Sequence, residues 1–122
     1  MFNDWIRRFL LKRVIEKVVN HTWKNVQFVQ EETSFFQLLS GTEVLEGCDP
    51  QAQIQVVLYL DPNDKEKLSF LTTKGFGPIE NTKHMYTVEL PREEPDRVLD
   101  LIIYLIDKVG NGKKIGYNVY DV

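Results

Sequence analysis

The stretch QIQVVLYL, residues 53–60, decides the fold class because its apolar residues recur with the period of a β-strand. In an extended chain successive side chains point to opposite faces, so every second residue shares a face. One face of this stretch is wholly apolar, and the other also carries large apolar groups, so we expect both faces to be covered. We predict a largely buried, central strand with Ile54, Val56, Leu58 and Leu60 on one face and Val57 and Tyr59 on the other.

The residues that follow predict a hairpin and then a further strand. DPND at 61–64 is typical of a turn, because proline presets φ and short polar side chains bond to the nearby backbone. Residues 68–73 are expected to run back as the hairpin partner, and a loop through Gly75, Gly77 and Pro78 follows. HMYTVEL, residues 84–90, then predicts another strand, which Pro91 closes.

A second helix is expected over residues 95–109. Pro95 stands at its first turn, acidic residues lie near its positive end, and Gly110 follows its last apolar residue. Apolar residues cover more than half of its circumference, which indicates deep burial against a sheet. After this helix the tail IGYNVYDV, residues 115–122, predicts a last strand.

Upstream of the central strand we expect a loop, a hairpin and a first helix. Residues 40–52 are rich in turn formers and contain at most a short strand at 43–45. Residues 23–39 are rich in β-branched and aromatic side chains on both sides of the polar EETS at 31–34, which predicts two strands joined by a turn. The first helix should end near Asn20 and His21.

These elements predict one α+β domain over residues 1–122. Its mostly antiparallel sheet of about five to six strands would carry the N-terminal and C-terminal helices on one face. A length of 122 residues suits a single domain. In element order alone, the layout is similar to the small secretion-chaperone-like folds of bacteria, and that resemblance implies a helix-flanked sheet that binds protein.

Composition limits the class of protein and its surroundings. With 43% hydrophobic and 27% charged residues, the chain has the composition of a folded domain and not of a disordered one. Cys48 is the sole cysteine, which excludes an internal disulfide and favours a reducing compartment. Basic residues interrupt the apolar start of the chain, which argues against a cleavable signal. We therefore expect a cytoplasmic protein.

The first helix has apolar residues on two opposite faces. At about 100° per residue, one arc can face a core: Leu10, Leu11, Val14, Ile15, Val18 and Val19. A second group lies roughly opposite: Phe2, Trp5, Ile6 and Phe9. Residues 1–24 hold six basic and two acidic residues, whereas the whole chain has a net charge of −3. Such a contrast orients the helix on its own acidic domain or presents a basic, aromatic strip outward.

No motif for chemistry is present, so no catalytic residue, metal ligand or cofactor is predicted. His21 and His84 stand in no metal-type spacing, and DPNDKE lacks the glycine of a calcium loop. Acidic neighbours of Cys48 would raise its thiol pKa, which disfavours a nucleophile. Phe76, between two glycines, is expected to fold back over the core. We expect a binding protein more than an enzyme.

Two interpretations of the aromatic group remain open. The tail strand or the loop at 40–52 could cover it as a second layer of core, or it could form an exposed contact patch. In the second case the chain is an interaction, adaptor or chaperone-like domain that binds a partner protein or a second copy. Trp5 and Phe9 would be the anchors, and Arg8 and Arg13 would set orientation. A membrane surface is less favoured because the polar face is interrupted, and the acidic net charge argues against nucleic acid.

The competing hypothesis is a small-molecule-binding protein or an enzyme. Its pocket would lie between the sheet and the C-terminal helix. The polar side chains available to such a pocket are Tyr59, Tyr86, His84 and Tyr104.

Overall fold

The computed structural model describes residues 2–30, 33–40, 49, 51–61, 63–110 and 115–121, with the backbone alone for 2–4, 33, 34 and 121. The elements run in the order α1 (Phe2–Val19), β1 (Asn25–Gln30), β2 (Thr33–Leu39), β3 (Gln53–Tyr59), α2 (Lys65–Thr73), β4 (Gly77–Pro78), β5 (Met85–Pro91), α3 (Pro95–Tyr104), η1 (Leu105–Val109) and β6 (Ile115–Asp121). Here η1 is a π-helical continuation of α3. The expected strand at 43–45 and Cys48 lie outside the described residues.

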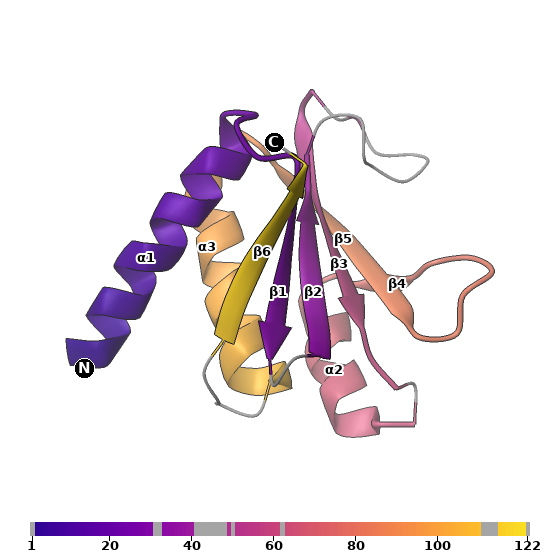
Figure 1. The fold of residues 1–122 in the computed structure, drawn as a ribbon. Helices are drawn as coiled ribbons and strands as arrows, with labels where there is room; N and C mark the ends of the chain where they lie inside the picture. Colours follow the sequence, from indigo (N-terminus) through magenta and orange to yellow (C-terminus); the bar gives the residue numbers. More distant parts are fainter. Residues whose placement is uncertain are drawn as a thin grey trace.

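The strands form one six-stranded antiparallel sheet in the order β4-β5-β3-β2-β1-β6. Helices α2 and α3 lie behind this sheet in Figure 1, and α1 stands alongside α3, beyond the edge formed by β6. The predicted α+β class with an antiparallel sheet and flanking helices is therefore confirmed. β3 lies between β5 and β2, as its double-sided apolar pattern predicted.

The core forms between the helices and one face of the sheet. A row of paired apolar residues crosses four strands, from Val26 through Leu38 and Val56 to Val88. From the helix layer, Ile102 and Leu105 are fully buried against this face. The helix α1 contributes four buried side chains from its predicted inner arc: Leu11, Val14, Ile15 and Val18.

The prediction of a strand at residues 68–73 is wrong, because these residues form most of α2. The carboxylate of Asp64 accepts a hydrogen bond from the backbone N–H of Lys67, so the turn formers at 61–64 lead into a helix and not into a hairpin. Leu71 is fully buried. The hydroxyl of Thr72 donates to the carbonyl of Leu68, which lets a β-branched residue sit in the last turn.

The hairpin partner of β5 is instead the two-residue strand β4, in the stretch where we predicted a loop. Gly77 pairs with Thr87, and Pro78 pairs with Tyr86. Phe76, just before β4, is buried in the core as expected. Gly75 has φ of 89°, a conformation that glycine adopts without steric cost, and it turns the chain out of α2 toward this strand.

One arginine fastens the C-terminal end of α1 to the sheet. The guanidinium of Arg92 donates to the carbonyl oxygens of Val18 at 3.2 Å and Val19 at 2.9 Å, which are groups that a helix end leaves without partners. The same guanidinium reaches the carbonyls of Gln51 at 3.3 Å and Gln53 at 3.4 Å, beside the start of β3. The end of α1 is thereby held to the sheet by the residue that follows β5.

Candidate functional site

The outward face of α1 exposes large apolar side chains. Trp5 is 66% exposed and Phe9 51%, and their rings stack with centroids 6.0 Å apart at an interplanar angle of 15°. Trp5 and Phe9 are therefore not covered by the tail strand β6, and most of the 40–52 loop lies outside the described residues. Ile6 is half-buried, and the side chain of Phe2 is not described.

Leu10 corrects the predicted division of α1 into two faces. We placed it on the core-facing arc, yet it is 57% exposed, while Leu11 beside it is buried. The reason is the position of α1 beyond the edge of the sheet, which leaves only a narrow strip of the helix in contact with the core (Figure 1). Leu10 therefore joins Trp5 and Phe9, and we call these three exposed residues the α1 patch.

The arginines around the α1 patch differ in their surroundings. Arg8 forms a salt bridge of 2.8 Å with Asp100, and Arg7 contacts both carboxylate oxygens of Asp107 at 3.0 and 3.4 Å. Both partners lie on α3 or its π-helical end, so these pairs orient α1 on the acidic side of its own domain. Arg13 is exposed and forms no ion pair with any residue that the structure describes.

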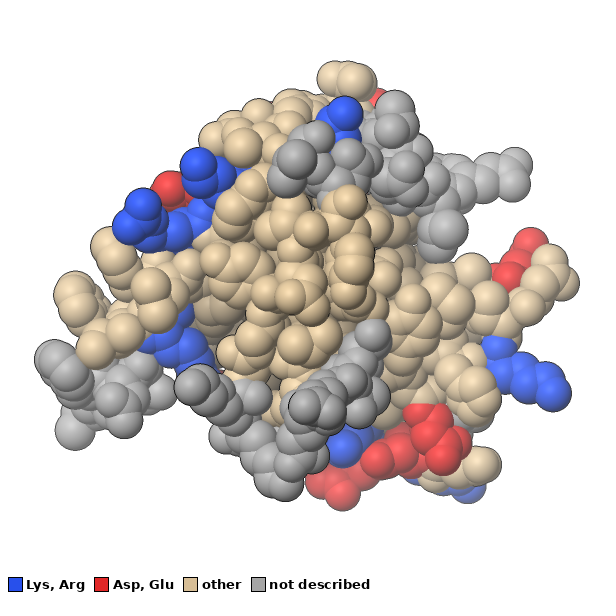
Figure 2. Space-filling model, in the orientation of Figure 1, with Lys and Arg blue, Asp and Glu red and all other residues tan. Residues whose placement is uncertain are grey.

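An apolar groove separates α1 from β6. It consists of two neighbouring hollows of about 150 and 480 Å³ that share Leu10, Val14 and Tyr117. Phe28 lines the smaller hollow and Trp23 the larger. Basic side chains contribute to the walls, and Figure 2 shows them along α1 beside a central surface without charge. The basic lining residues are Arg7, Arg13 and Lys17.

Our reading of the sequence missed this groove because its two walls are distant along the chain. Leu10 and Val14 come from the first helix, and Tyr117 comes from the last strand. Helical periodicity identified apolar residues on α1 but carries no information about which strand lies opposite them. The one available signal was Tyr117, a large aromatic residue that shares a strand face with the apolar Ile115 and Val119.

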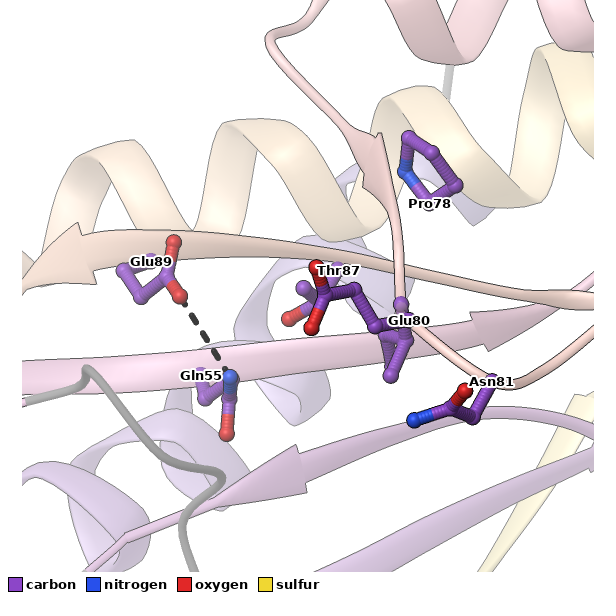
Figure 3. A pocket seen from close by; sticks show the side chains of 7 residues that line it. Gln55, Pro78, Glu80, Asn81, Thr87 and Glu89 are labelled. Carbon is purple, nitrogen blue, oxygen red and sulfur yellow. Dashed lines mark hydrogen bonds between the residues drawn. The ribbon is translucent and has the colours of Figure 1, made fainter.

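A third hollow, of about 570 Å³, lies on the sheet face opposite the helices. Figure 3 shows the amide of Gln55 donating to the carboxylate of Glu89 at 3.4 Å, with Glu80 and Asn81 approaching from the loop after β4. Thr87 on β5 completes the polar lining. Polar residues at alternate positions of β3 and β5 were the sequence signal for this face, and we did not use it.

The tyrosines and histidine proposed for a pocket beneath the C-terminal helix do not converge. Tyr59 and Tyr86 follow opposite faces of the sheet, since Leu58 pairs with Tyr86 and Tyr59 with Met85. His84 is exposed, and the hydroxyl of Tyr104 donates to the carbonyl of Phe70 at 3.4 Å. At the expected place, side chains fill the space between helix and sheet: Ile102, Leu105 and Val109, each at most 3% exposed.

The described part of the chain meets the requirements of neither a metal site nor a membrane span. It contains no group of three or more histidine, cysteine, aspartate or glutamate side chains that could hold a metal ion. None of its helices combines the length and the apolar character needed to cross a lipid bilayer. His21, at the end of α1, adopts φ of 66° and donates its backbone N–H to the carbonyl of Val18, as a residue that ends a helix.

Comparison of the whole chain with models of protein families found no match. Comparisons with curated proteins and with solved structures found none either. Function must therefore be inferred from geometry: from the α1 patch, the neighbouring groove and the hollow on the sheet face opposite the helices.

Proposed function

We propose that this protein is a small protein-binding domain, an adaptor or chaperone-like module, whose N-terminal helix α1 is its contact element. The observation that carries the proposal is the stacked pair Trp5 and Phe9, which stands in solvent with Leu10 beside it. Large apolar groups gathered on a surface usually mark a contact site. The single cysteine, Cys48, further favours a reducing compartment, and we place the protein in the cytoplasm.

The chemistry of the α1 patch fits a protein partner. Tryptophan and arginine are the residues that most often dominate the energy of protein interfaces. Stacking already restricts Trp5 and Phe9, so less side-chain entropy is lost when a partner covers them. Arg13 lies on the same helix and would orient an acidic partner, while Arg8 is already held by Asp100.

The occupant of the α1 patch is either a second copy of the chain or a different protein. Self-association through a two-fold axis would bring two patches together. Light scattering over a range of concentrations separates the two cases, because a dimer has twice the 14.3 kDa of the chain. Trp5→Ala should weaken whichever complex forms, and Tyr59→Ala, which removes an exposed aromatic ring from the opposite side of the sheet, should not.

A strict monomer at all concentrations assigns the patch to a different protein. In that case the wild-type chain and Trp5→Ala are immobilised side by side, and the proteins retained from a lysate are compared. The proposal is wrong if Trp5→Ala matches the wild type in both oligomeric state and retained proteins. Because Ile102, Leu105 and Val109 fill the space beneath α3, the competing hypothesis of a pocket there has less support.

A further inference from the structure

We infer that the groove between α1 and β6 binds an extended, acidic segment of a partner protein, and that this segment pairs with β6 as an additional strand. The inference rests on the proposed protein-binding function and specifies the form and charge of the partner. It draws on the pairing state of the sheet edges, the shape of the groove and its charge.

The two edges of the sheet differ in how they are protected. At one edge β4 has only two residues, one of which is Pro78, and short strands and prolines are common devices against further pairing. At the other edge β6 has seven residues with no proline and no lysine. Within the described residues, the backbone hydrogen bonds of β6 all go to β1. β6 therefore presents unpaired backbone groups along one side.

The groove lies beside this open edge and suits the side chains of an added strand. In a strand, every second side chain points to the same face. The two hollows adjoin along α1 and share Leu10, Val14 and Tyr117, so they can receive successive inward-pointing apolar side chains of one extended segment. Main-chain pairing would supply affinity, and the hollows would supply selectivity, as in other cases of strand addition.

The charge of the groove selects an acidic partner over a second copy. Arg7 lines the smaller hollow and is already paired with Asp107, whereas Arg13 and Lys17 line the larger hollow and form no salt bridge in the described part of the chain. Glutamate or aspartate in the added strand would face these groups. Two copies joined through their β6 edges would instead bring their α1 helices together, because α1 stands beyond that edge (Figure 1). Like charges on the two helices would then oppose pairing.

The test is a selection of short random peptides on the whole 122-residue chain, followed by solution binding of the enriched sequence as a synthetic peptide. We expect enriched peptides to carry both apolar and acidic residues at the alternate positions that point toward α1. The double variant Arg13→Glu, Lys17→Glu should weaken binding at least about tenfold. Lys65→Glu, a charge reversal at an exposed position of α2, should leave the affinity unchanged.

Hydrogen exchange of the backbone amides separates strand pairing from charge attraction alone. On addition of the peptide, exchange should slow at alternate residues between Ile115 and Val119, the part of β6 in regular register with β1. A peptide that is N-methylated at the alternate positions facing β6 should lose binding, whereas methylation at the intervening positions should not. These two results together would establish an added strand.

Several outcomes would overturn the inference. They are an empty selection, enrichment of basic peptides, unchanged exchange along β6, and formation of a β6-dependent dimer without peptide. The parallel measurement with Trp5→Ala keeps the two hypotheses apart. If partner binding falls with Trp5→Ala while β6 is unaffected, the strand-addition inference is wrong and the proposed function stands. If Trp5→Ala also has no effect on any complex, both are wrong.

Discussion

Replacement of Arg92 by alanine should loosen the joint between α1 and the sheet and lower the stability of the whole domain. The guanidinium makes its two shorter bonds, 2.9 and 3.2 Å, to Val19 and Val18. A hydrogen bond that involves a charged group contributes about 1.5–3 kcal/mol. The bonds share one donor group, and Arg92 is only half-buried, so the contributions add incompletely. We expect a loss of about 2–4 kcal/mol in the free energy of unfolding.

Urea unfolding followed by circular dichroism measures this loss, as a lower midpoint with an unchanged slope. Arg97→Ala is the matched control, because Arg97 forms only an exposed pair with Glu94 three residues earlier in the chain. That control should lose at most about 0.5 kcal/mol. Arg92→Lys should be intermediate, since an ammonium keeps the charge but cannot reach several carbonyls at once. If Arg92→Ala is no more destabilising than Arg97→Ala, the assigned role of Arg92 is refuted.

Three further substitutions test the packing and the helix ends by the same unfolding assay. Ile102→Ala removes a fully buried side chain between α3 and the sheet and should cost about 2–5 kcal/mol; a cost below about 1 kcal/mol would contradict the tight packing described for that face. Asp64→Ala removes the cap of α2 and should cost about 0.5–2 kcal/mol, and an unchanged midpoint would mean that the bond to Lys67 contributes nothing. Gly110→Ala would place a methyl group 2.8 Å from the carbonyl oxygen of Ile106 and 3.1 Å from the ring of Phe35, so we expect a loss of about 1–3 kcal/mol, which a neutral result would refute.

The elements with strong local signals were predicted correctly from the sequence. Strand β3 has apolar residues on both faces, and α3 has Pro95 at its start and Gly110 after its π-helical end. These signals depend on neighbouring residues, so no knowledge of the tertiary structure was needed. Residues 68–73 were different, because two threonines favoured a strand while Leu68 and Leu71 had the spacing of a helix. Burial of Leu71 and the cap at Asp64 decided between them.

The candidate site could be predicted only in part for a related reason. Periodicity located Trp5 and Phe9 opposite the core-facing arc, but whether another segment covered them depends on the path of the whole chain. Leu10 is exposed because α1 lies beyond the β6 edge of the sheet, and local sequence periodicity cannot predict that position. The groove needs Tyr117 from the other end of the chain, so it exists only in the folded state.

The unequal edges of the sheet also determine how many strands it can accept. Within the described residues, β4 offers two residues for pairing and β6 offers seven, so lateral growth is favoured at one edge. A molecule with two open edges could pair with a further strand at each of them, and repeated pairing would produce an open-ended polymer. A molecule with one site stops after a single addition, which limits any assembly through this sheet to a fixed, small stoichiometry.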